Sequence, residues 1–65
     1  MSKKQDYIVL DARAMHDMDD ATVFGFARSL EEAREICHSN GEGVIYHNSL
    51  PNLNEGDFVE YVPAQ

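Results

Sequence analysis

The chain has 65 residues, and a domain of this size buries only about 60% of the surface that its unfolded chain exposes. Its formal net charge at pH 7 is −7, from 12 carboxylates against 5 lysines and arginines. Direct binding to nucleic acid is disfavoured, because phosphate contacts need a cationic surface. The hydrophobic fraction of 43% is ordinary for a folded domain, so the low-hydrophobicity signature of a disordered chain is absent.

The chain carries no sign of secretion or of a membrane anchor. Its single cysteine, Cys37, excludes an internal disulfide framework and favours a reducing cytoplasm. The apolar run at residues 7–10 is too short for a signal peptide or a membrane span. We therefore expect a cytoplasmic, soluble single domain over residues 1–65, with loose ends at 1–5 and 63–65.

Residues 7–13 predict a first strand, because they begin with aromatic and β-branched residues and then alternate. Ile8, Leu10 and Ala12 share one face of that strand. After a polar stretch at residues 15–20, the segment 22–27 predicts a second strand that closes a long hairpin. Alternation places Phe24 and Phe26 on one face and Gly25 on the other.

A helix is predicted from Leu30, because Ser29 precedes it and Glu32 follows three residues later, which is the spacing of a capping box. Asn40 and Gly41 provide a left-handed stop. Along the helix the apolar residues fall on one stripe, which is typical of a helix lying on a sheet. That stripe consists of Leu30, Ala33, Ile36 and Cys37.

Residues 43–47 and 57–62 predict the third and fourth strands, separated by a turn region around Pro51. Chain direction and a right-handed crossover place the first strand between the second and the third. The predicted fold class is α+β with the element order ββαββ: a mostly antiparallel four-stranded sheet in the order 2-1-3-4, with the helix on one face.

The polar segment His16–Asp20 is the densest group of metal-type ligands. With Asp17 at the first position of a calcium loop, Ala21 stands at a ligand position, Thr22 replaces the turn glycine and Arg28 replaces the final glutamate. No zinc-type spacing is present either. We expect no metal and no cofactor, and a solvated hairpin loop in which an aspartate caps a turn.

No residue pattern indicates catalysis. Cys37 lies on the apolar stripe, where a small buried thiol is the common outcome, and His38 points about 100° away around the helix. A core this small leaves little room for a typical substrate cleft. We therefore expect a protein that is not an enzyme.

The sheet has one helix for two faces, so its second face needs another cover. Alternation suggests that Tyr7, Tyr46 and Tyr61 form a partly exposed aromatic ladder on the face away from the helix. Met15 and Met18 flank the acidic loop, where they serve either as adaptable partner contacts or as an extension of the core. Weak self-association or target binding through this face stays open.

Carboxylates recur in every exposed element, and this is the strongest functional signal in the chain. One interpretation is that they only keep a small domain soluble. The other is that they form a rigid array that fits a basic groove, as nucleic-acid phosphates do. The residues expected to contact such a partner are Asp17, Asp19, Asp20, Glu31, Glu35 and Glu42.

In length, acidity, lone cysteine and strand-strand-helix-strand layout the chain resembles small phage and mobile-element proteins that inhibit bacterial defence, particularly anti-CRISPR proteins directed at type I complexes. The segments Tyr7–Arg13, Asp17–Val23 and Ser29–Ala33 also resemble short phage proteins. The resemblance implies a non-enzymatic inhibitor in a bacterial host's cytoplasm. It would occupy the DNA-binding or motif-reading surface of a Cascade-type complex, with type I-C among the candidates.

Two functions follow from the sequence. The first is an acidic DNA mimic that blocks a nucleic-acid-binding protein, such as a subunit of a type I CRISPR effector. The alternative is an adaptor or regulatory subunit that docks through its exposed sheet face or an edge strand. Salt and competing DNA should weaken the first interaction strongly and the second only slightly.

Overall fold

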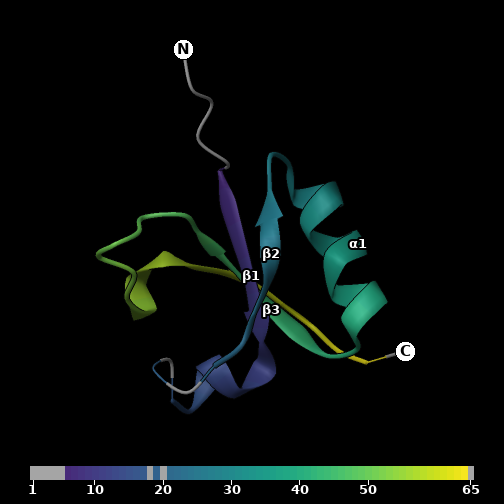
Figure 1. Cartoon of the computed structure of the whole chain (residues 1–65), viewed down its shortest axis with the longest axis horizontal. Helices are drawn as coiled ribbons and strands as arrows, with labels where there is room; N and C mark the ends of the chain where they lie inside the picture. The colour runs from purple at the N-terminus through teal and green to yellow at the C-terminus, as the bar shows by residue number, and fades with distance from the viewer. Residues whose placement is uncertain (1–5, 18, 20, 65) are drawn as a thin grey trace.

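The computed structural model describes residues 6–17, 19 and 21–64, so the loose end predicted at 1–5 lies outside the described residues, as does residue 65 of the loose end predicted at 63–65; Pro63 and Ala64 are exposed and follow the last strand. Within the described part, four strands form one antiparallel sheet in the order β2-β1-β3-β4, as predicted (Figure 1). A helix packs on the sheet. The elements are β1 (Tyr7–Asp11), β2 (Val23–Ala27), α1 (Leu30–Asn40), β3 (Gly43–His47) and β4 (Phe58–Val62).

The predicted start and stop signals of α1 are confirmed. The Ser29 side chain accepts a hydrogen bond from the Glu32 backbone N–H at 3.1 Å, which satisfies one of the free donors of the first turn. The Glu32 carboxylate accepts from the Arg28 N–H at 2.8 Å, one residue earlier than a reciprocal capping box requires. Gly41 ends the helix with φ 104°, a backbone conformation that favours glycine.

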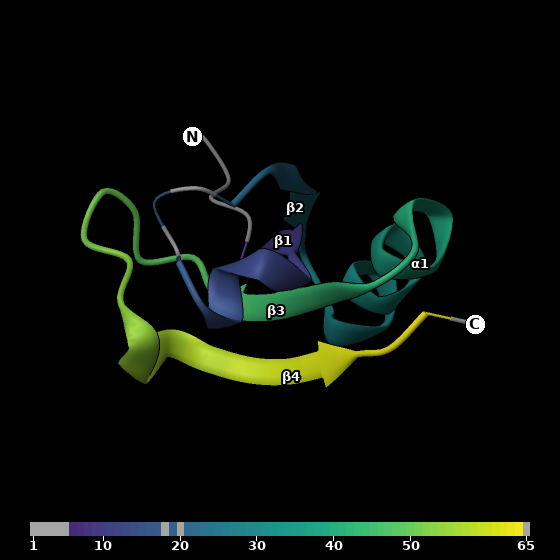
Figure 2. The ribbon, with the colours of Figure 1, turned by 90° about the horizontal axis from the view of Figure 1, so that it is seen from below.

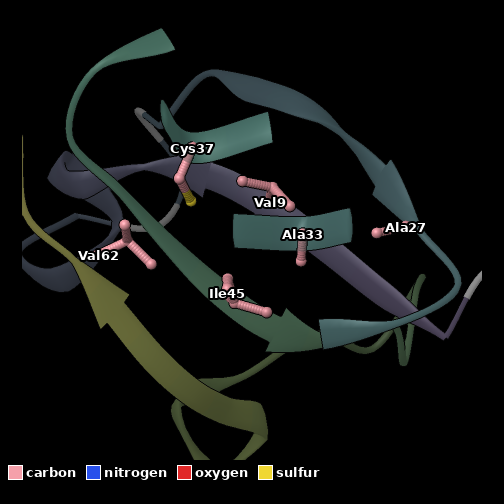
Figure 3. Close-up of a cluster of buried hydrophobic side chains, with 6 residues drawn as sticks. All are labelled: Val9, Ala27, Ala33, Cys37, Ile45 and Val62. Atoms are coloured by element: carbon pink, nitrogen blue, oxygen red, sulfur yellow. The ribbon is translucent and has the colours of Figure 1, made fainter. Parts of the chain in front are cut away.

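One core lies between α1 and the sheet (Figure 3). Ala33 and Cys37 of the predicted apolar stripe are completely buried there, against Val9 of β1 and Ile45 of β3. Close approach of the helix depends on Gly43, where a Cβ atom would lie 2.9 Å from the Cys37 sulfur. Small residues on both sides therefore let helix and sheet meet at short distance.

A second core lies on the opposite face of the sheet, formed by Ile8, Leu10, Val44 and Tyr46. No α-helix covers this face within the described part of the chain. Its cover comes from Ala14 in the short 3-10 helix η1 (Ala12–Met15) and from Leu53 in the connection between β3 and β4. Figure 2 shows η1 and that connection away from α1, on the other side of the sheet. We call it the loop-covered face.

The predicted end of the first strand is wrong, because β1 stops at Asp11. The Asp11 side chain accepts a hydrogen bond from the Arg13 N–H at 3.0 Å, and such a side-chain bond competes with strand pairing. The chain therefore turns into η1, and Ala12 does not continue the strand face.

The predicted face assignments of three aromatic residues are also wrong. The register between β1 and β2 shifts between Val9 and Leu10. Such a shift interrupts the strict alternation of side chains between the two faces of the sheet. Phe24 consequently packs on the helix side, while Phe26 pairs with Ile8 on the loop-covered face. Tyr7 packs on the helix side as well, so the expected ladder of three tyrosines does not form.

Candidate functional site

The charged surface is exposed and little neutralised. No charged or polar residue is buried among those described. Among the same residues, Arg34 of α1 and Glu60 of β4 form the ion pair that is found, with 2.8 Å between the Arg34 nitrogen and the Glu60 oxygen. Arg34 makes two hydrogen bonds to the Glu60 carboxylate, which lower the pKa of Glu60 and raise that of Arg34.

The loop between η1 and β2 holds part of the predicted acidic site. The Asp17 side chain accepts a hydrogen bond from the Asp19 N–H at 3.1 Å, which is the capped turn expected from the sequence. Both residues are exposed. Asp20, the third predicted aspartate, lies outside the described residues, as does Met18.

Glu42 lies at the same end of the sheet, because Asp11, where the loop begins, pairs with Gly43. Tyr61 of β4 donates a hydrogen bond from its hydroxyl to the Glu42 carboxylate, which raises the pKa of Tyr61. The two residues border a cavity of about 540 Å³ that carries both charge signs. Its lining consists of Asp11, Ala12, Arg13, Met15, His16, Glu42 and Tyr61.

Glu31 and Glu35 are placed elsewhere. Both are exposed on α1, outside the apolar stripe that packs on the sheet. Asp19 instead borders the loop-covered face, in a groove of about 250 Å³ with Ile8 and Leu10 as part of its floor. The predicted contact residues therefore do not form one array: Asp17 and Asp19 share the loop, Glu42 borders the cavity beside Tyr61, and the two helix glutamates lie on α1.

A third depression, which we call the η1–β4 hollow, lies on the loop-covered face and has a volume of about 300 Å³. It is lined by Ala14, Met15, Tyr46, Glu55 and Phe58. Apart from Met15 and Tyr46, sequence reasoning did not assign these residues to a partner-binding site. The hollow depends on the path of the connection between β3 and β4, which local sequence patterns do not determine.

The connection between β3 and β4 is held by local hydrogen bonds. Ser49 donates its hydroxyl to the Asp57 carboxylate at 2.6 Å, and the Asn54 N–H donates to the same oxygen at 3.1 Å. These two bonds lower the pKa of Asp57. They fix the short 3-10 helix η3 (Glu55–Asp57) directly before β4.

The described residues offer few groups for chemistry. They contain no group of three or more histidine, cysteine or carboxylate side chains that could hold a metal ion. Cys37 is buried in the helix-side core, as predicted, and burial raises the pKa of its thiol. The nucleophilic thiolate form is therefore disfavoured.

Over the same residues, no helix is long and apolar enough to cross a membrane. Comparison of the chain with models of known protein families, with curated proteins and with solved structures found no significant match.

Proposed function

We propose that this protein is a non-enzymatic acidic inhibitor that imitates DNA and blocks a nucleic-acid-binding protein. Its exposed carboxylates take the place of phosphates at a cationic surface of the target. Attraction between such surfaces accelerates association and makes the complex sensitive to salt.

One observation carries the proposal: most of the described carboxylates are exposed on a folded scaffold and none is buried, and among the same residues Arg34–Glu60 is the ion pair found. Most of the described carboxylates therefore face solvent without an ion-pair partner from the described part of the chain. Short hydrogen-bonded turns and a capped helix fix the backbone that carries these carboxylates, so little backbone entropy is lost when a partner binds.

The narrower target that we propose is the DNA-binding surface of a type I CRISPR effector in a bacterial cytoplasm. The resemblance to small anti-CRISPR proteins in length, acidity and layout supports this narrower target. Purified type I-C Cascade provides its test: excess protein should prevent the complex from binding target DNA. Unchanged DNA binding would remove this target and leave the wider proposal to be tested on other proteins.

The wider proposal is tested by capture from a bacterial lysate at about 50 mM and about 300 mM NaCl, since the screening length falls over that range. The immobilised protein should retain nucleic-acid-binding proteins at the lower salt concentration. A DNA duplex should displace them. Retention that neither salt nor DNA reduces would contradict the proposal.

Two double variants show which acidic group makes the contact. Asp17→Lys with Asp19→Lys reverses charge on the loop, and Glu31→Lys with Glu35→Lys applies the same change in charge to α1. The four positions are exposed, so both variants should keep the fold, as circular dichroism can verify. We expect the loop variant to lose the captured partner and the helix variant to retain more of it.

An adaptor function is the second candidate, and the exposed apolar side chains of the loop-covered face favour it. Val23 and Phe26 on β2 and Phe58 on β4 are all more than two-fifths exposed there, at the two edges of the sheet, and exposed apolar surface of this kind commonly marks a protein interface. An adaptor of this kind would bind a partner with little dependence on salt or DNA. Substituting Phe26 by Ser would then reduce capture more than either charge reversal.

A further inference from the structure

The η1–β4 hollow combines exposed apolar walls with a single charged group. Met15 is 54% exposed on one side and Phe58 is 43% exposed on the other, although both side chains are apolar. Tyr46 is 3% exposed and belongs to the second core. The hollow is therefore an apolar recess at the surface, supported from beneath by packed core.

The aromatic part of the hollow has a defined geometry. Tyr46 and Phe58 pack edge to face, with ring centroids 5.7 Å apart and an interplanar angle of 85°. This arrangement is a favoured one for aromatic pairs. Because β3 and β4 pair at these two residues, the rings are held by the sheet and not by a loop.

The charged group is Glu55, the first residue of η3. Asn54 caps η3 by accepting a hydrogen bond from the Gly56 N–H at 2.8 Å, and the Asn54 N–H donates to Asp57. The backbone of Glu55 is thus fixed between two capping bonds. Its carboxylate acts on Tyr46, whose pKa is raised by burial first and by the negative charge of Glu55 second.

We propose that the η1–β4 hollow binds an arginine side chain of a protein partner. The aliphatic stem would pack on Met15 and Ala14, and the guanidinium group would meet the Phe58 ring and the Glu55 carboxylate. A guanidinium suits this setting because it is planar, weakly hydrated and able to stack on an aromatic ring while it donates to a carboxylate.

Charge complementarity selects this occupant. Glu55 is the charged residue in the lining of the hollow, and the chain around it carries a net charge of −7. A second copy of the chain would bring two strongly acidic molecules together, which like-charge repulsion opposes. The inference rests on the proposed function, since it describes how one basic residue of a cationic partner is recognised.

Nuclear magnetic resonance provides the test, with a peptide of alternating arginine and glycine as the probe. A matched peptide in which citrulline replaces arginine keeps the shape of the side chain and removes its charge. We expect the arginine peptide to shift the Met15 methyl signal and the Phe58 and Tyr46 ring signals. The citrulline peptide should leave them in place.

Two variants and one control sharpen the result. Glu55→Gln should raise the dissociation constant of the arginine peptide about threefold, the effect of losing one partly exposed charge pair. Phe58→Leu, which keeps apolar bulk without the aromatic face, should also weaken binding. Asp6→Asn removes one exposed charge outside the lining of the hollow and should change the constant by less than a factor of about two.

Four outcomes would overturn the inference. In the first, the arginine peptide binds but shifts signals around Glu31 and Glu35, which leaves the acidic-surface function intact and removes the hollow as the site. In the second, the citrulline peptide binds equally well. In the third, the Met15 signal moves with protein concentration alone, which identifies a second copy as the occupant. In the fourth, the arginine peptide does not bind at about 50 mM NaCl, which removes the hollow as an arginine site, while the capture experiment tests the proposed function separately.

Discussion

The two faces of the sheet are built from similar strand residues but are covered in different ways. On the helix side, α1 places Ala33 and Cys37 against Val9 and Ile45, and all four side chains are fully buried. On the loop-covered face, η1 and the connection between β3 and β4 bring Ala14 and Leu53 onto the core and leave Met15 and Phe58 exposed beside open depressions.

This difference assigns most of the stability to the helix side of the sheet and partner recognition to the loop-covered face. A helix buries a continuous stripe and excludes water from one face, whereas short segments bury single residues and leave recesses between them. In a chain of 65 residues, one closely packed face must supply much of the stability. The other face is then able to carry surface that a partner can recognise.

Truncation of one core residue on the helix side should have the largest effect. Ile45→Ala removes a fully buried side chain and should lower the free energy of unfolding by about 2–5 kcal/mol. Met15→Ala on the loop-covered face should lower it by less than about 1 kcal/mol, because Met15 is half exposed. Urea titration compares the two variants, and equal losses would contradict the division between the faces.

Close packing under α1 is tested at two glycines. A Cβ atom at Gly43 would lie 2.9 Å from the Cys37 sulfur and 3.0 Å from the Leu10 carbonyl oxygen, so Gly43→Ala should cost about 1–3 kcal/mol. At Gly25 the nearest contact is an ordinary 3.5 Å to Ile36. Gly25→Ala should therefore be neutral or slightly stabilising, and thermal unfolding of both variants provides the comparison.

The two capping residues extend the comparison to smaller effects. Ser29→Ala removes the cap of α1 and should cost about 1 kcal/mol of global stability. Asn54→Ala removes the cap of η3 and should cost less, because η3 is short and exposed. Its main effect should be local, seen as faster amide hydrogen exchange at Gly56. A larger loss of global stability from Asn54→Ala than from Ser29→Ala would contradict the expectation that the cap of α1 contributes more than the cap of η3.

Acid should have the smallest and most gradual effect. The pKa values of Asp57 and Glu60 are lowered in the folded state from ordinary values of 3.8 and 4.5. The unfolded chain therefore binds protons first as the pH falls, and the stabilisation from both carboxylates is present above their ordinary pKa values and lost as the pH falls through the folded ones. Glu60→Gln and Asp57→Asn should each flatten this acid dependence, as urea titrations at several pH values can measure.

The sequence predicted the fold well because the informative signals are local. Ser29, the apolar stripe and Gly41 define α1, and the direction of successive elements then limits the strand order. Chain topology also placed Glu42 near the acidic loop, at the end of the sheet where Asp11 pairs with Gly43.

What the sequence could not predict depends on long-range packing. The shift in register at Val9 and Leu10 moves Phe24 to the other face, and neither strand signals it on its own. The η1–β4 hollow requires residues from η1, β3, η3 and β4 to meet. Its walls are ordinary apolar residues whose exposure is set only when the connection between β3 and β4 folds back.

The most direct measurement is the dissociation constant of a captured partner as a function of salt, with and without a competing DNA duplex. We expect the constant to rise at least tenfold between about 50 mM and about 300 mM NaCl, because exposed charges are screened over that range. The duplex should displace the protein at every salt concentration tested. Two results together would contradict imitation of a polyanion: a dissociation constant that does not change with salt, and a partner that binds the DNA duplex and the protein at the same time.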